Sequence, residues 1–112
     1  MATYAHSGLA LDALGDPTRR SILDLLRAGP RSVGELASDL PVTRPAVSQH
    51  LKVLGEARLV THEKAGTRNI YRLDADGLED ARAWLEAFWA QALAELKAAA
   101  EKDNHDEGEG NG

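Results

Sequence analysis

Three helix-start signals fall in the first half of the chain and cut it into short segments. Asp16 is a good N-cap residue and is followed by proline at the first helical position. Ser32 and Glu35 have the spacing of a capping box, in which each side chain satisfies the other residue's backbone N–H. Thr43 is a plausible N-cap for a further helix, and Pro45 is compatible with it because proline is tolerated in a first turn. These signals predict that the first half of the chain forms several short helices and not a single long helix.

Apolar residues follow each signal at helical spacing. Leu9, Leu11 and Leu14 indicate a first short helix that ends at Gly15. We expect the next helices to end at Gly29-Pro30 and near residue 40, and a longer one at about 43–57. In this last helix Val47, Leu51 and Leu54 form the inward face; the outward residues are Arg44, Ser48, Gln49 and Lys52.

The second half predicts a hairpin and a long helix. Residues 59–63 and 69–73 are rich in β-branched and aromatic side chains, and residues 64–68 join them as a basic loop. A helical pattern returns at about 77–100. Residues 101–112 hold five acidic residues and three glycines without an apolar anchor, so we expect a disordered acidic tail.

The fold class predicted is mainly α with a small β-hairpin. It comprises about five helices and a two-stranded wing in one domain, residues 1–100, followed by the tail. Two short helices with a tight turn between them, the second polar on its outer face, describe a helix-turn-helix. A basic hairpin directly after the second helix makes this a winged helix-turn-helix, an arrangement typical of DNA-binding proteins.

Net charge alone argues against a nucleic-acid partner, because the chain carries −5. The charge is unevenly distributed, however. Residues 41–73 contain six basic and two acidic side chains, net +4, whereas residues 76–112 contain three basic and ten acidic ones, net −7. A phosphate backbone responds to the local excess, so the segment with the predicted helix-turn-helix and wing is suited to DNA.

The candidate DNA-binding residues lie on the recognition helix and the wing. The first turns of a helix in the major groove can present Arg to guanine and Gln to adenine, whereas lysines suit phosphates. A wing arginine can reach a narrow minor groove. The candidates are Thr43, Arg44, Pro45, Ser48, Gln49, Lys52, Lys64 and Arg68. The alternative for each of them is an ordinary solvated surface residue with no binding role.

Several of these motifs together resemble the ArsR-type winged-helix regulators of transcription. The similarity covers about residues 9–96, and its motifs lie at 16–23, 33–37, 44–54, 57–60 and 66–73. The resemblance implies a homodimer on a two-fold-related operator, with Arg44, Pro45, Ser48 and Gln49 placed where family members contact bases. It points to a subgroup with an aromatic-rich last helix that often lacks metal sites.

The last helix predicts the dimer interface. A helix over residues 77–100 is about 36 Å long, too long to be covered by a core built from the first 75 residues. Its apolar stripe would be a large exposed patch unless a second copy covers it. The predicted interface residues are Leu9, Leu78, Leu85, Phe88, Trp89 and Leu96. The alternative is that Trp84 and Trp89 pack on their own domain.

A metal-responsive regulator is an alternative, using nickel or zinc. The chain has no cysteine, and no histidine lies between Gly77 and Asn104, so both metal sites of the resembled family lack their ligands. His6 and His105, with nearby carboxylates, are weak candidates for a site of another kind. We therefore expect no metal and no cofactor.

Two other function classes are weighed. A winged helix can serve in protein–protein contact, but that role does not require basic residues along one side. Enzyme activity is not expected, because no phosphate loop, nucleophile elbow or metal triad is present, and Ser48 and His50 do not face each other on a helix. The N-terminus lacks the pattern of a signal peptide and no apolar run reaches a membrane span, so we expect a cytoplasmic protein without a membrane partner.

Overall fold

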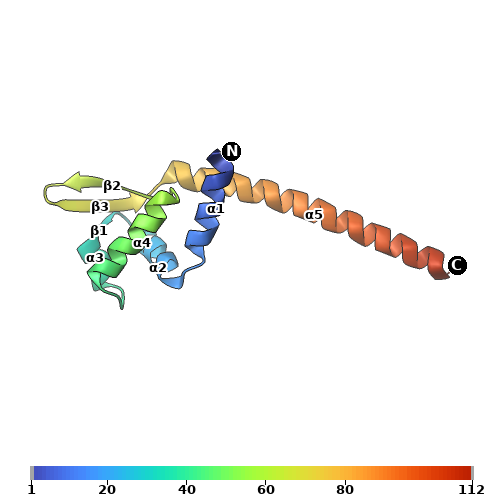
Figure 1. The fold of residues 1–112 in the computed structure, drawn as a ribbon, viewed down its shortest axis with the longest axis horizontal. Coiled ribbons are helices and arrows are strands. Elements are labelled where there is room, and N and C mark those ends of the chain that lie inside the picture. The colour runs from blue at the N-terminus through green and yellow to red at the C-terminus, as the bar shows by residue number, and fades with distance from the viewer. Residues whose placement is uncertain (1, 112) are drawn as a thin grey trace.

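The computed structural model describes the backbone of residues 2–111 and the side chains of residues 8–103. A body of short helices and a small sheet carries one long helix that projects away from it (Figure 1). The elements in chain order are α1 (Ala2–Leu14), α2 (Pro17–Arg27), β1 (Arg31–Ser32), α3 (Val33–Ser38), α4 (Arg44–Glu56), β2 (Val60–Ala65), β3 (Arg68–Leu73) and α5 (Ala75–Asn111).

All three predicted helix starts are confirmed. The carboxylate of Asp16 accepts hydrogen bonds from the backbone N–H groups of Thr18 and Arg19 at 2.8 and 3.1 Å. The capping box is complete: the Ser32 hydroxyl accepts the Glu35 N–H, and the Glu35 carboxylate accepts the Ser32 N–H. The Thr43 hydroxyl accepts the N–H of Ala46 at the start of α4.

The core is small and collects the inward faces of the short helices. Its largest fully buried side chains are Ile22, Val47, Leu36, Leu51, Leu54 and Leu59. Burying a side chain of this kind contributes about 1.5–3 kcal/mol. Since α2, α3 and α4 each contribute to this cluster, the core fixes how the two helices of the helix-turn-helix, α3 and α4, lie relative to each other.

The sheet has three strands, where the sequence predicts two. β1 pairs antiparallel with β3, Arg31 opposite Tyr71 and Ser32 opposite Ile70, so the order is β1-β3-β2. A strand of two residues is too short to show the alternation of apolar and polar residues by which strands are predicted. The sequence pattern therefore does not reveal β1. This short strand ties the wing to the residue that caps α3.

The wing strands also extend further than predicted. β2 pairs with β3 from Val60 opposite Leu73 to Ala65 opposite Arg68, which leaves only Gly66 and Thr67 in the turn. Gly66 has φ 65°, at the first loop position where two-residue type II′ turns need glycine. The predicted loop 64–68 is therefore wrong in extent: Lys64 and Arg68 belong to strands.

α5 runs past its predicted end near residue 100 and continues to Asn111. Alanines at positions 98–100 favour helix, and Glu101–Asp103 continue it with exposed side chains. The side chains of residues 104–112 lie outside the described part, and the expected disordered tail stays a prediction. Near its start, ion pairs of Arg82 with Glu79 and Glu86 at helical spacing support α5.

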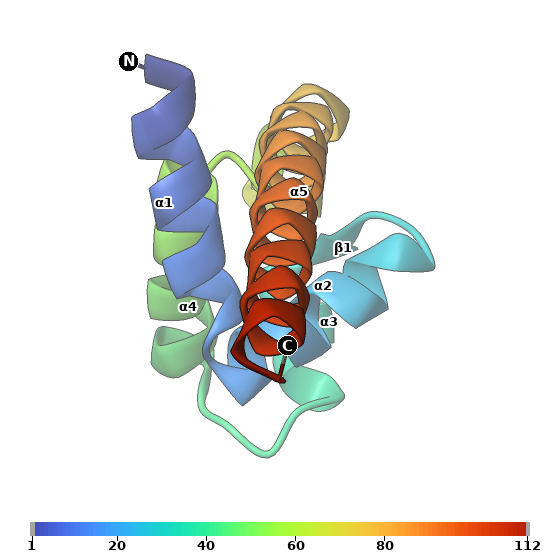
Figure 2. The same cartoon turned by 90° about the vertical axis from the view of Figure 1, so that its right-hand side faces the viewer.

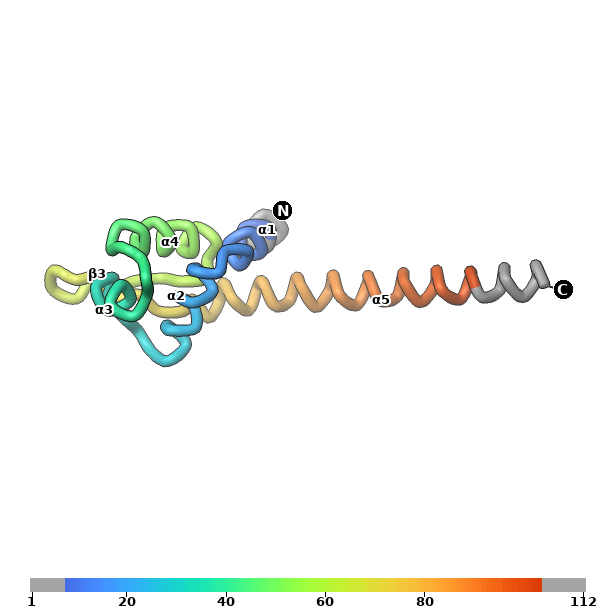
Figure 3. Tube along the Cα trace, turned by 90° about the horizontal axis from the view of Figure 1, so that it is seen from below, coloured from blue at the N-terminus to red at the C-terminus, as the bar shows by residue number. Residues whose placement is uncertain are grey.

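The wing and α5 lie at opposite ends of the molecule, whose extents are 75 × 30 × 21 Å (Figures 1 and 3). α1 lies beside the first part of α5 and contacts it (Figure 2). α1 begins at Ala2, earlier than the leucine pattern alone predicts. No helix in the described part of the chain is long and apolar enough to cross a membrane.

A close approach at Gly77 joins the connection between α4 and β2 to α5. A Cβ added at Gly77 would overlap the carbonyl oxygen of Arg58 and lie 2.8 Å from its carbonyl carbon. Arg58 itself has φ 58° and pairs with Asp80 at 2.9 Å. Since backbone atoms have no free rotamer by which to move away, this position requires glycine.

We expect Gly77→Ala to lower the free energy of unfolding by about 1–3 kcal/mol or more, as overpacking does. Chemical denaturation followed by circular dichroism measures this. Gly55→Ala is the matched control, because a Cβ at Gly55 meets nothing within 4 Å and alanine favours helix. Equal stability of the two variants would contradict the close approach.

Candidate nucleic-acid interface

The outer face of α4 is polar and unengaged. Val47, Leu51 and Leu54 are buried, and the opposite side of the helix is therefore exposed. Three of the predicted DNA-binding residues lie there, and within the described part of the chain none has a hydrogen-bond or ion-pair partner: Ser48, Gln49 and Lys52. Arg44, at the start of the helix, lies beside Gly34 of α3 and likewise has no such partner among the described residues. Their donors and acceptors are available to an external ligand.

Thr43 and Pro45 have local roles at the start of this helix. The Thr43 hydroxyl caps α4, accepting a hydrogen bond of 3.3 Å, and Pro45 occupies the first turn, where its missing N–H costs nothing. Both residues are exposed, so they are also accessible from outside.

The two wing residues differ in their surroundings. Lys64 is exposed and has no ion-pair partner among the described residues. Arg68 is directed toward α3: its Nη2 donates to the Ser32 hydroxyl at 2.7 Å and to the Glu35 carboxylate at 3.1 Å. Arg68 is therefore held against the helix-turn-helix rather than extending from a loop.

Hydrogen bonds that the Glu35 carboxylate accepts from Ser32 within the capping box keep it charged. The N–H of Ser32 contributes most, its hydroxyl next, and the nearby Arg68 guanidinium adds to them, together holding the pKa of Glu35 below its usual range. Glu35 is thus ionised at neutral pH and available to Arg68 as an anionic partner.

Two other basic residues of the 41–73 segment are neutralised within the chain. Arg58 pairs with Asp80, and Arg72 pairs with Glu63, each at 2.9 Å. The positive charge that stays available is concentrated on α4 and the wing, at Arg44, Lys52, Lys64 and, in part, Arg68. The segment's net charge therefore comes from the predicted contact residues.

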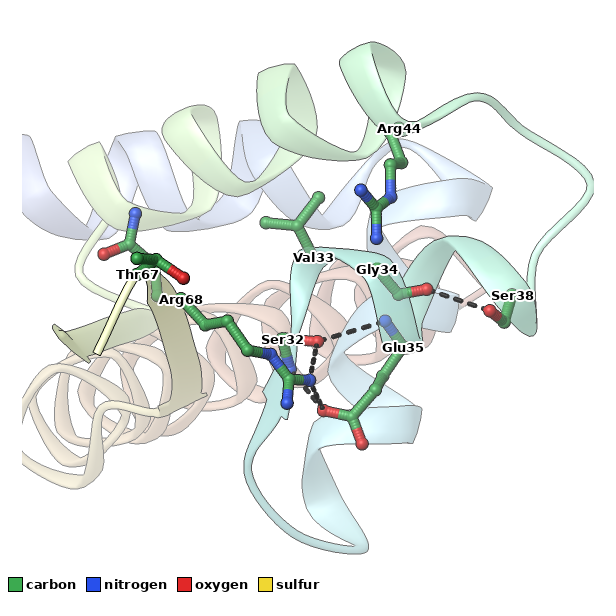
Figure 4. Close-up of a pocket in the computed structure, with 9 residues that line it drawn as sticks. Ser32, Val33, Gly34, Glu35, Ser38, Arg44, Thr67 and Arg68 are labelled. Carbon is green, nitrogen blue, oxygen red and sulfur yellow. Dashed lines mark hydrogen bonds and ion pairs between the residues drawn. The ribbon is translucent and has the colours of Figure 1, made fainter. Parts of the chain in front are cut away.

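A cavity of about 490 Å³ lies between α3, α4 and the wing (Figure 4). It brings together two predicted residues, Arg44 and Arg68, which are distant in sequence. The other lining residues were not predicted as site residues: Ser32, Val33, Gly34, Glu35, Ser38, Thr67 and Asn69. The capping-box spacing marks Ser32 and Glu35 as structural residues, and only the β1–β3 pairing places them beside the wing.

Most of the predicted interface residues of α1 and α5 are exposed. Trp89 and Leu96 are 62% and 66% exposed, and Leu9, Leu85 and Phe88 are about half exposed. Leu78 differs, because it packs against the core of its own chain. Trp84 is partly buried and stacks on Phe88 with ring centroids 5.5 Å apart, so one tryptophan is largely covered and the other is not.

Among residues whose side chains are described, no group of three His, Cys, Asp or Glu could hold a metal ion. The weak candidates His6 and His105 lie outside those residues. His62 contacts Tyr71 on the wing, with ring centroids 4.9 Å apart, which is a packing role.

The described geometry matches known regulators. The family model for the bacterial regulatory proteins of the arsR family matches residues 16–62, from the N-cap of α2 into β2. The HTH-type transcriptional regulator Rv2034 of Mycobacterium tuberculosis is 57% identical over 83% of this chain and 87% of its own length. The chain belongs to the ArsR family.

Solved structures agree with this membership. An ArsR-like transcriptional regulator from Rhodococcus sp. RHA1 is 36% identical, with a TM-score of 0.74 over 89% of this chain and 97% of that one. A homodimeric winged helix-turn-helix DNA-binding domain from Mycobacterium bovis is 31% identical, with a TM-score of 0.60 over 84% and 80%. This ArsR-family chain has the winged helix-turn-helix fold and is a transcriptional regulator, not an enzyme.

We expect Arg68→Ala to destabilise this ArsR-family protein by about 1 kcal/mol, because it removes charged hydrogen bonds to Ser32 and Glu35 that solvent partly screens. Lys64→Ala is the control, since Lys64 has no such contact among the described residues and surface changes stay within about 0.5 kcal/mol. Thermal unfolding of both variants measures the difference. If Lys64→Ala were as destabilising as Arg68→Ala, the contact would not hold the wing.

Proposed function

We propose that this protein binds a two-fold-related operator in duplex DNA as a homodimer. In this proposal α4 enters the major groove and the wing lies at the adjacent minor groove. Family membership supports the class of function. The observation that carries the specific proposal is the polar outer face of α4, whose side chains have no partners within the described residues.

The chemistry of that face suits base reading in its first turns and phosphate contact further along. Gln49 can donate to and accept from adenine, and the Ser48 hydroxyl can serve a base or a phosphate. Lys52 lies about one turn further along α4 and is suited to a phosphate as a point charge. Lys64 on the wing has the same chemistry at the other groove.

A second copy of the chain is the partner for the exposed apolar face. Among the residues whose side chains are described, eight large hydrophobic ones are exposed, and they lie on two adjacent helices: Leu9, Leu11 and Leu14 on α1, and Leu85, Phe88, Trp89, Leu93 and Leu96 on α5. A patch of this kind is an aggregation liability on a monomer. The M. bovis relative is described as homodimeric, which supports the same assembly here.

Dimerisation would determine the symmetry and the half-site spacing of the operator. Two symmetry-related α4 helices would enter successive major grooves about 34 Å apart, so the operator would have two-fold symmetry. The wing lies at the opposite end of the molecule from the projecting part of α5 (Figure 1), which keeps the wing away from the α5 part of the proposed interface.

Gln49→Ala tests base reading. We expect it to weaken binding to an operator duplex by about 1–3 kcal/mol and to leave binding to a scrambled duplex nearly unchanged. Lys64→Ala is the phosphate control: it should weaken both duplexes alike and lower the salt slope by about 0.9. Fluorescence anisotropy at several salt concentrations measures both. Equal losses of Gln49→Ala on the two duplexes would rule out base reading by this residue.

Leu85→Asp tests the dimer. We expect it to produce monomers and to abolish operator binding, because a carboxylate cannot be buried unpaired in an apolar interface. Ala94→Asp is the matched control, since nine residues at about 100° each place Ala94 on the opposite side of α5. Sedimentation analysis and anisotropy report on both variants. A Leu85→Asp protein that still binds DNA as a dimer would show that the interface lies elsewhere.

A further inference from the structure

The cavity between α3, α4 and the wing has the lining of an anion site. Hydroxyl and amide groups come from Thr67 and Asn69, and guanidinium groups come from Arg44 and Arg68; the Ser38 hydroxyl also lines the cavity but donates to the Gly34 carbonyl at 3.0 Å. Glu35 is the only acidic residue among those that line it, so the lining carries a net charge of about +1. Planar guanidinium groups match the oxygens of a phosphate, which makes phosphate the fitting class of ligand.

Arg44 turns back from the start of α4 toward the first turn of α3 (Figure 4). A Cβ at Gly34 would overlap Nη2 of Arg44 and lie 3.1 Å from its Cζ, so the guanidinium rests against the glycine. Within the described residues no group accepts a hydrogen bond from it. Its donors are therefore presented to the cavity, and not along the helix face that carries Ser48 and Gln49.

Arg68 approaches the same cavity from β3, on the other side of the α3 start (Figure 4). Only its Nη2 is engaged, by the Ser32 hydroxyl and the Glu35 carboxylate. Nε and Nη1 have no hydrogen-bond partner among the described residues. Glu35 thus acts as a positioning residue: it holds Arg68 by one nitrogen and leaves the others for a ligand.

We propose that this cavity binds one phosphate diester of the DNA backbone between Arg44 and Arg68, so that Arg44 contacts the backbone and does not read bases. This inference rests on the proposed function. A sugar-phosphate strand separates the major groove from the minor groove. If α4 enters the first and the wing lies at the second, that strand passes between them, where the cavity lies.

The test uses the full chain and an operator duplex that the wild-type protein selects from a randomised pool. Arg44→Ala and Arg68→Ala should each weaken binding about tenfold, on the operator and on a scrambled duplex alike. Each should lower the salt slope, and the double variant should lower it by about 0.9 in total, as expected for one shared phosphate. A loss for Arg44→Ala on the operator alone would overturn the proposal.

Duplexes with a single neutral methylphosphonate, moved along the backbone, locate the phosphate. At one position per half-site the wild type should lose about tenfold, and on that duplex neither arginine variant should lose more. If no position removes the effect of both substitutions, the two arginines do not share a phosphate and the proposal fails.

Gly34→Ala tests the position of Arg44 without deleting its charge. The added methyl should displace the guanidinium and reproduce the loss of Arg44→Ala, while the melting temperature stays the same or rises because alanine favours helix. Gly55→Ala, also a helical glycine but with open space around it, should bind like the wild type. Wild-type affinity of a folded Gly34→Ala protein would overturn the proposal.

Inorganic phosphate distinguishes a duplex site from a site for small anions. At constant ionic strength, millimolar inorganic phosphate should leave the duplex affinity unchanged. Competition that Arg44→Ala removes, combined with a duplex affinity that no methylphosphonate position lowers, would assign the cavity to a free anion and overturn the proposal. Failure of the wild-type chain to select any sequence would instead contradict the proposed operator binding, so the two failures are distinguishable.

Discussion

The hydroxyl of Ser32 is the point on which the DNA-binding half of the molecule depends. The hydroxyl caps α3 and accepts a hydrogen bond from Arg68 on β3, and Ser32 itself lies in β1. It is also the only buried polar residue among those described. A buried hydroxyl without partners costs about 1–3 kcal/mol. The Glu35 N–H satisfies this hydroxyl at the start of α3, and the Arg68 contact links the wing to the helix-turn-helix.

The order of helices could be predicted because each start is encoded by residues within one turn. Asp16, Ser32 with Glu35, and Thr43 cap their helices through contacts no more than three residues apart. The recognition face of α4 follows from its apolar period in the same way. Its candidate contact residues, however, stay predictions until DNA binding is measured.

The features that no local sequence pattern indicates depend on contacts between distant residues. β1 is a strand only because β3 lies beside it, and Arg68 reaches Glu35 across 33 positions of the chain. No local pattern records such a pairing, so Arg68 was predicted to extend from a loop. The extra length of α5 has a different cause: alanines with strong helix propensity carry it past the acidic residues where disorder was predicted.

The contacts at Gly77 fix the start of α5 against the connection between α4 and the wing. Here the start of α5 touches the backbone of Arg58, one residue before Leu59, and the Leu59 carbonyl accepts the N–H of Asp74. Arg58 pairs with Asp80 on α5 as well. α5 therefore cannot tilt without moving the end of α4 and the base of the wing. In a dimer held by α5, a change in helix crossing would thus reach the spacing of the two α4 helices, which makes the interface the natural place for regulation.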